Sequence, residues 1–287
     1  MHLTDAQGIT ELFDYAFITV KSYDTEWATH FIRRYVKPDG FFVSIQNCWN
    51  DPVIGGILGN DKEIGCIASH IEVALWEPGH VNRGGEPGRD HGHTVFRVAE
   101  LSGPVTPRSQ MIADKLNLID AAYTSDNLLV NDGPSYVKMV WGMLFQPCPP
   151  WDLKIWQNNI DCRRIRINLA KEGAKVGIAQ GLKVVEIGGK SAEFWADADK
   201  GDVFEELDDY MASRGGSVNW LASMAQDVHK GRHSEIDFMN GLISQKGREF
   251  GVPTPYNDAV IEAMHGFDNG SVKPDPSNVD RVMRLIA

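Results

Sequence analysis

Short apolar runs alternate with helical patterns through the first 128 residues, and this alternation restricts the possible folds more than any other feature. Residues 14–20 and 41–45 are apolar, β-branched runs typical of buried strands. Between them, residues 25–36 place Trp27 and Phe31 at helical spacing. Since consecutive parallel strands need a crossover connection, this rhythm predicts a parallel sheet with right-handed crossovers.

The strand signal fades after about residue 128, and a polar, glycine-rich segment (residues 77–92) interrupts it earlier. The remaining predicted strands are residues 64–71, 94–101 and 120–123, and the remaining predicted N-terminal helices are residues 52–58 and 108–116. The later predicted helices are residues 135–145, 163–180, 202–213, 235–250 and 257–265. We therefore expect an α/β domain over residues 1–128, an all-helical domain over residues 129–270, and a loosely packed tail (residues 271–287).

The charge balance excludes one large class of partner. The 287 residues hold 28 basic and 39 acidic side chains, a formal charge of -11, whereas nucleic-acid binding needs clustered Lys and Arg. No stretch approaches the ~18 apolar residues of a membrane helix, and the N-terminus has no apolar signal core. We expect a cytoplasmic protein that binds neither nucleic acid nor a membrane.

The sequence only partly matches two familiar ligand-binding motifs, a P-loop and a zinc site. Residues 188–191, Gly-Gly-Lys-Ser, resemble the end of a P-loop, but Val184 stands where its first Gly should be. His80, His91 and His93 share the polar segment, yet no Cys or further His lies at the tight spacing of a zinc site. We therefore expect no metal site.

Polar residues follow two neighbouring predicted strands. Lys21 comes directly after the first strand, and Asn47 follows the second strand 26 residues later. Open α/β sheets bind ligands at the carboxyl ends of their strands, so we expect Lys21 and Asn47 to face one crevice. We interpret Cys48, beside Asn47, as a plain thiol, because the sequence shows no base that would activate it as a nucleophile.

A third polar segment lies far along the chain. Residues 223–227 read Ser-Met-Ala-Gln-Asp, and residues 231–241 read Gly-Arg-His-Ser-Glu-Ile-Asp-Phe-Met-Asn-Gly. Ser234 with Asp237 three residues later predicts a capping box that opens the helix at 235–250. By itself the segment is equally consistent with a capped helix and with a binding site.

Together these segments resemble the ketopantoate reductases (2-dehydropantoate 2-reductases). The strand-end Lys, the following Gln-Asn, Ser-Met-x-Gln-Asp and the Glu-Ile-Asp block fit the family's pattern, and residues 251–257, Gly-Val-Pro-Thr-Pro-Tyr-Asn, resemble its closing segment. The resemblance implies an N-terminally incomplete Rossmann-like parallel-sheet domain, followed by a helical domain like that of 6-phosphogluconate dehydrogenase. It also implies NADP(H) and a small 2-keto acid in the cleft between the domains, and a homodimer formed through the helical domain.

The resemblance assigns binding roles to five residues. It implies that Lys21, Asn47 and Glu235 contact the cofactor. It implies that Asn47, Ser223 and Gln146 contact the substrate, so that Asn47 touches both molecules.

By the same resemblance the catalytic residues are Glu235 and a proton-donating Lys that opens the pattern Lys-x3-Asn-x3-Asn-Pro. Lys138 fits this frame, and spacing of four keeps it on one helix face with Gly142 and Gln146. A positioned ammonium group stabilises and protonates the alkoxide that hydride addition creates. Lys154 opens a rival frame that lacks the following Pro, and we favour Lys138.

The chain departs from the family pattern at several points. Gly142 and Gln146 stand where the family has Asn, and Cys48 stands where Gly follows Gln-Asn. Family members begin with a strand, a G-x-G-x-x-G turn and a helix, and these 287 residues contain no such turn. Because that turn supplies the backbone N–H groups that bind pyrophosphate, we expect weak NADPH affinity.

Two functions remain open. The first is NADPH-dependent reduction of a 2-keto acid to the 2-hydroxy acid by hydride transfer, which the presence of Lys21, Asn47, Lys138, Ser223 and Glu235 favours. The alternative is a non-redox descendant, either a keto-acid-binding protein or a lyase or isomerase, which the missing glycine turn favours.

Overall fold

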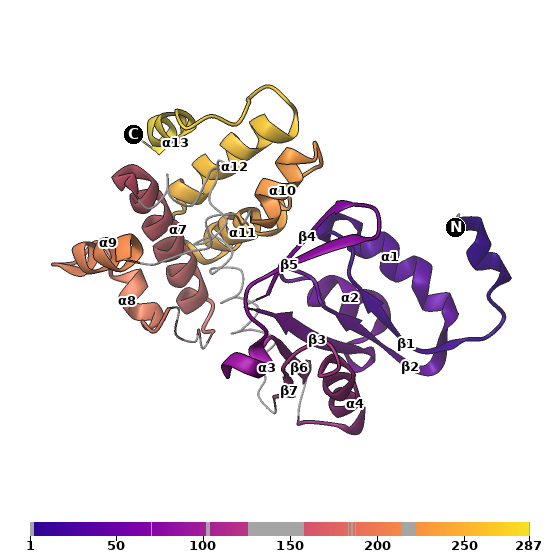
Figure 1. Cartoon of the computed structure of the whole chain (residues 1–287). Coiled ribbons are helices and arrows are strands. Elements are labelled where there is room, and N and C mark those ends of the chain that lie inside the picture. The colour runs from indigo at the N-terminus through magenta and orange to yellow at the C-terminus, as the bar shows by residue number, and fades with distance from the viewer. Residues whose placement is uncertain are drawn as a thin grey trace. The chain divides into compact units, whose positions relative to one another are not determined.

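The computed structural model divides the chain into two compact units. Its described residues are 3–69, 71–101, 104–125, 158–182, 184, 186, 188–213 and 222–286. One unit comprises Met1–His70 with Glu86–Asn131, and the other comprises Ile71–Gly85 with Asp132–Ala287 (Figure 1). The domain boundary expected at residues 128 and 129 lies outside the described residues.

The first unit is built on a five-stranded sheet in the order β1-β2-β3-β6-β7. The strands are β1 (Phe13–Ile18), β2 (Val36–Ser44), β3 (Glu63–Ala68), β6 (Phe96–Glu100) and β7 (Ala122–Thr124). Strands β1, β2 and β3 run parallel, as the strand–helix rhythm predicts. Strand β6 runs antiparallel to β3, and β7 runs parallel to β6.

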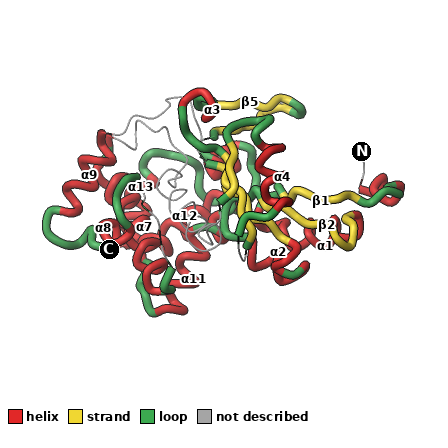
Figure 2. The backbone as a smooth tube through the Cα atoms, turned by 90° about the horizontal axis from the view of Figure 1, so that it is seen from below, coloured by secondary structure: helices red, strands yellow, loops and turns green. Residues whose placement is uncertain are grey.

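Helices cover both faces of this sheet, because successive strand side chains point to opposite faces. Phe42 on β2 packs in one buried cluster with Ile54 of α2 (Asp51–Leu58), and Ile32 of α1 (Thr25–Ile32) packs against it. The neighbouring Phe41 points to the other face, where the Arg108 guanidinium of α4 (Pro107–Leu116) lies 5.5 Å from its ring centroid. Figure 2 shows α4 on one side of the strands and α1 and α2 on the other.

Two elements of the first half differ from the predicted pattern. Strand β2 begins at Val36 rather than near residue 41, and it makes a register shift against β1. The shift brings the chains so close that a Cβ at Gly40 would lie 2.7 Å from the carbonyl oxygen of Asp14, which explains the glycine there. The polar segment at residues 77–92 contributes to a hairpin, β4 (Glu72–Glu77) with β5 (His80–Gly84), and to the short helix α3 (Gly88–His91).

The second unit is helical apart from that hairpin. Its helices are α7 (Ile160–Ala179), α8 (Ala192–Ala196), α9 (Val203–Ser213), α10 (Ser223–His229), α11 (Asn240–Phe250), α12 (Pro255–Asp268) and α13 (Asn278–Ile286). The predicted helices near 163–180, 202–213 and 257–265 correspond to α7, α9 and α12, whereas the helix predicted at 135–145 lies outside the described residues. No described helix has the length and apolar character needed to cross a membrane.

A buried carboxyl group on α7 joins that helix to the start of α12. Glu172, which is 3% exposed, accepts hydrogen bonds from the backbone N–H groups of Tyr256 and Asn257, both at 2.9 Å, and from Asn257 Nδ2 at 2.7 Å. Burial raises the pKa of Glu172 to about 7, although these donors oppose the shift. Because N–H groups at a helix start lack partners within the helix, Glu172 acts as the cap that α12 does not supply itself.

Two expectations for the C-terminal half were wrong. Ser234 does not form a capping box, because its hydroxyl donates to Asp268 Oδ2 at 2.8 Å, and Asp237 instead contacts His265. A 3-10 turn (Ile236–Phe238) follows, and α11 begins only at Asn240. The predicted loose tail contains α13, whose Val279 and Val282 are buried at 2% and 0% exposure.

The fully buried Glu63 at the start of β3 generates a testable pH dependence. Burial, with the negative Asp51 nearby, raises the pKa of Glu63 to about 10. The folded protein therefore keeps this proton where the unfolded chain, with a pKa of about 4.3, has lost it. Between these pKa values the folded state binds more protons, so its stability falls as pH rises, by up to ~1.4 kcal/mol per pH unit.

Glu63→Gln removes this titration. Between pH 6 and pH 8 the free energy of unfolding should fall in both proteins or in the wild type alone, and the fall should be about 2–3 kcal/mol larger in the wild type than in Glu63→Gln. Urea unfolding at the two pH values measures the difference. Glu26→Gln, on the exposed face of α1, is the matched control and should follow the wild type. Equal pH dependence in wild type and Glu63→Gln would show that Glu63 is ionised in the folded protein.

Candidate functional site

Two polar side chains follow β1 and β2 at equivalent positions. Ile18, the last residue of β1, pairs with Ser44, the last residue of β2. Lys21 and Asn47 each lie three residues beyond these partners. Because the two strands are parallel, both residues lie at the carboxyl edge of the sheet, as the sequence predicts.

The buried amide of Gln46 joins the two loops that carry Lys21 and Asn47. Its Nε2 donates to the carbonyl oxygen of Val20 at 2.7 Å and lies 2.8 Å from the hydroxyl of Thr25 at the start of α1. Gln46 is 7% exposed, so these bonds form away from water. One side chain thus connects the end of β2 with the end of β1 and the helix that follows it.

A second buried amide fixes the backbone at Asn47. Asn50 Nδ2 donates to the carbonyl oxygen of Asn47 at 2.9 Å and to the Ser22 hydroxyl at 3.1 Å. Both Asn50 and Ser22 are 3% exposed. Sequence reasoning identified Asn47 but missed Gln46 and Asn50 as the groups that hold the loops. The signal was three amide side chains within the six residues that follow β2.

Cys48 has an unusual backbone conformation within this loop. Its φ of 68° lies in the left-handed region, and it is the only non-glycine residue with positive φ among the described residues. This region favours glycine because a Cβ there meets the following carbonyl oxygen. The geometry gives a physical reason for the family's Gly at this position, and it indicates that Cys48 is strained.

The other candidate residues belong to the second unit. Ser223 begins α10 and is half-buried, and Glu235 comes just before the 3-10 turn and is 3% exposed. The candidates therefore form one group with Lys21 and Asn47 and another with Ser223 and Glu235. Lys138, Gln146, Gly142 and the rival Lys154 lie outside the described residues.

Helix α10 also contacts the β4–β5 hairpin. Gln226, in the Ser-Met-x-Gln-Asp segment, donates from Nε2 to the carbonyl oxygen of Val73 at 3.3 Å. One turn further, the Lys230 ammonium lies 4.6 Å from the ring centroid of Trp76. The hairpin, which the sequence did not predict, therefore packs against the helix that begins at Ser223.

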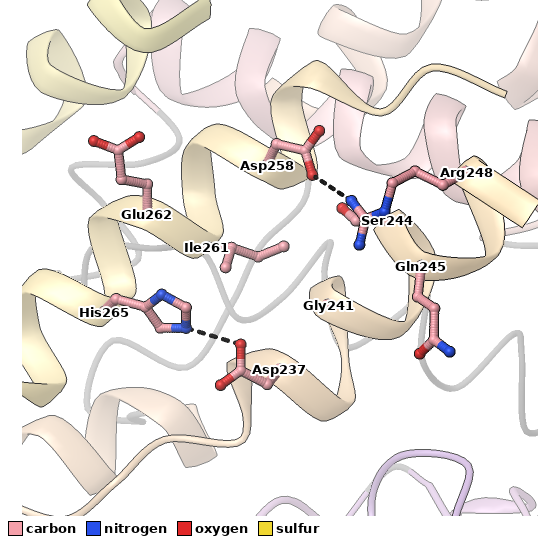
Figure 3. Close-up of a pocket in the computed structure, with 9 residues that line it drawn as sticks. All are labelled: Asp237, Gly241, Ser244, Gln245, Arg248, Asp258, Ile261, Glu262 and His265. Carbon is pink, nitrogen blue, oxygen red and sulfur yellow. Dashed lines mark hydrogen bonds and ion pairs between the residues drawn. The ribbon is translucent and has the colours of Figure 1, made fainter.

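A pocket lies between α11 and α12 in the second unit. Figure 3 shows its polar lining, in which His265 Nε2 lies 2.8 Å from Asp237 Oδ1 and Arg248 lies 3.8 Å from Asp258. Its lining residues are Asp237, Gly241, Ser244, Gln245, Arg248, Asp258, Ile261, Glu262 and His265. Neither Ser223 nor Glu235, the predicted site residues described in this unit, lines the pocket.

The histidines of the polar segment do not gather into a metal site in the part of the chain that the structure describes. Within it, no group of three or more His, Cys, Asp or Glu side chains is arranged to hold a metal ion. His80 instead lies 3.9 Å from Glu77, and His91 lies 3.8 Å from Glu86.

Sequence models of one family match both halves of the chain. The model described as ketopantoate reductase PanE/ApbA matches residues 3–92. The model described as ketopantoate reductase PanE/ApbA C terminal matches residues 152–268, a span that includes Lys154 and leaves Lys138 outside.

Known proteins agree with these matches. A 2-dehydropantoate 2-reductase from Archaeoglobus fulgidus is 26% identical over 268 residues, covering 90% of this chain and 77% of the relative. The solved structure of D-mandelate dehydrogenase with NADH has a TM-score of 0.69 at 22% identity, covering 90% of this chain and 79% of that one. A dimeric ketopantoate reductase from Staphylococcus aureus has a TM-score of 0.65 at 13% identity, covering 93% and 81%. The two structural likenesses show a shared fold.

The left-handed backbone at Cys48 predicts an unusual order of stabilities. Cys48→Gly and Cys48→Ala both remove the sulfur, but only glycine relieves the positive φ. We expect Cys48→Gly to be more stable than Cys48→Ala by about 1 kcal/mol, measured by urea unfolding. If the alanine variant is as stable as the glycine variant, the backbone at position 48 is not left-handed.

Proposed function

Because the chain belongs to the ketopantoate reductase family, we propose that it reduces a 2-keto acid to the 2-hydroxy acid with NADPH as the hydride donor. The observation that carries this proposal is the pair of loops after β1 and β2, which the Gln46 amide joins by hydrogen bonds. These loops place Lys21 and Asn47 at the carboxyl edge of a largely parallel sheet. That edge is where open α/β sheets bind nucleotides.

The residues at this edge fit a dinucleotide. The Asn47 side chain has no hydrogen bond to another described residue, so its amide is available to the nicotinamide carboxamide, whereas its backbone is held by Asn50. Lys21 supplies a positive charge suited to a phosphate group. When bound, the reduced nicotinamide supplies a hydride.

The chain's own residues would complete the reaction at the carbonyl group of the substrate. Asn47, Ser223 and Gln146 would orient the keto acid by hydrogen bonds, and the buried Glu235 would lie where cofactor and substrate meet. As C2 accepts the hydride, its carbonyl oxygen becomes an alkoxide, and the ammonium group of Lys138 would donate the proton that makes the hydroxyl group. The products are then the 2-hydroxy acid and the oxidised cofactor.

We further infer that the protein acts as a homodimer. The dimeric ketopantoate reductase from Staphylococcus aureus, which shares the fold, supports this inference. The substrate class rests on the same kinship, since the relatives are named for 2-dehydropantoate and mandelate.

The proton donor has two candidates, which one experiment separates. Lys138 opens the better sequence frame, while the C-terminal family match includes Lys154 instead. If Lys138 is the donor, Lys138→Ala should lower kcat for NADPH-dependent keto-acid reduction by about 100-fold or more. Lys154→Ala should then change kcat by less than about threefold, because it removes a charge without removing the proton donor.

Steady-state kinetics with ketopantoate and related 2-keto acids measures both variants. The reverse result would assign the proton to Lys154. Equal losses would contradict both frames, and wild-type protein that reduces no 2-keto acid would contradict the proposed function.

A further inference from the structure

Arg97 lies at the same edge of the sheet as Lys21 and Asn47. Strand register aligns Ser44 of β2 with Gly65 of β3 and Ala99 of β6. These three residues form a row across the sheet. Because β6 runs antiparallel to β3, Arg97, two residues before Ala99, lies on the carboxyl side of this row. Asn47, three residues after Ser44, lies on the same side. Neighbouring strands are about 4.8 Å apart, so β6 is about 10 Å from β2.

The surroundings of Arg97 are apolar toward β3 and along β6, whereas Tyr123 on its other side is 42% exposed. Its direct cross-strand partners are Ile67 on β3 and Tyr123 on β7, so the three side chains share one face of the sheet. Ile67 is 7% exposed, and Ala99, next to Arg97 on that face, is 1% exposed. A guanidinium group in such a position loses part of its hydration.

This guanidinium has no compensating partner in the described part of the protein. Arg97 Nε is buried without a hydrogen bond, and no ion pair joins Arg97 to another described residue. Arg108, near the other end of β6, contrasts with it, because its Nε lies 3.0 Å and 3.2 Å from the two carboxylate oxygens of Glu100. Arg97 as a whole is part-buried, so its terminal nitrogens remain open to a ligand while its Nε lacks a partner among the described residues. A buried donor without a partner is costly, and an anionic group placed against this guanidinium would lower that cost.

We propose that Arg97 binds an anionic oxygen group of a ligand at the carboxyl edge of the sheet. The identity of this group rests on the proposed function: it is the carboxylate of the 2-keto acid or a phosphate of the dinucleotide. A guanidinium binds either one through two parallel N–H···O bonds. The residues assigned to orient the keto acid, Asn47, Ser223 and Gln146, are uncharged, and the lysine that would donate the proton acts at the C2 oxygen. Arg97 would therefore supply a positive charge for the carboxylate itself.

The first test observes Arg97 directly in the wild-type protein. The protein is labelled with ¹⁵N at arginine Nε, and the Arg97 signal is identified as the one absent from Arg97→Lys. Ketopantoate and pyrophosphate are then added separately, with the uncharged methyl ester of ketopantoate as the control ligand. We expect the Arg97 signal to move on saturation with at least one anion and to stay in place with the ester. An Arg97 signal that neither anion moves would overturn the proposal.

The second test measures affinities and separates the two anions. Arg97→Gln should weaken binding by about 10–100-fold, because hydrogen bonds to charged groups are worth about 1.5–3 kcal/mol. A loss confined to ketopantoate assigns the carboxylate, and a loss confined to NADPH assigns the phosphate. Arg34→Gln, an exposed arginine just before β2 at the opposite edge, is the matched control and should bind both ligands like the wild type.

Unchanged affinity of Arg97→Gln for both ligands, or an equal loss for ketopantoate and its ester, would contradict the proposal. These are binding measurements, so they are independent of turnover. If the Arg97 signal of the wild-type protein responds to an anion but the protein reduces no keto acid, the anion site is supported and the proposed reaction is contradicted.

Discussion

The candidate site depends most on the hydrogen bonds made by the buried side-chain amide of Gln46. This amide connects the carbonyl oxygen of Val20 in the loop after β1, the hydroxyl of Thr25 at the start of α1 and the loop after β2. Removing a buried amide of this kind leaves its partners unsatisfied, at a cost of about 1–3 kcal/mol. Asn50 also joins the two loops, through the Ser22 hydroxyl and the Asn47 carbonyl oxygen. The positions of Lys21 and Asn47 thus follow from buried polar contacts beside them.

Much of the fold was predictable because its signals are local. Apolar runs marked the strands, and the helical spacing marked α7, α9 and α12. The failures occurred where a distant residue decides the outcome. Ser234 has the sequence of a capping residue, but Asp268, 34 positions later, binds its hydroxyl. The hairpin was missed because its strands are largely exposed and polar, so they lack a buried apolar run, although Pro78 and Gly79 mark its turn.

The site was predictable to a similar extent, for the same reason. Parallel pairing alone brings Lys21 and Asn47 to one edge, so two strand ends in the sequence were sufficient to predict it. The burial of Gln46, the left-handed backbone of Cys48 and the missing partner of Arg97 depend on tertiary contacts that no local pattern encodes. A lone arginine inside an apolar strand was the only sequence signal for Arg97.

In the proposed reaction, NADPH bound to this protein transfers a hydride to the carbonyl carbon of a 2-keto acid. The most direct measurement is mass spectrometry of the product formed by the protein from ketopantoate and NADPH carrying deuterium at both C4 positions. The account predicts a 2-hydroxy acid with one deuterium on C2. A product without deuterium, or no hydroxy acid from any 2-keto acid supplied, would contradict it.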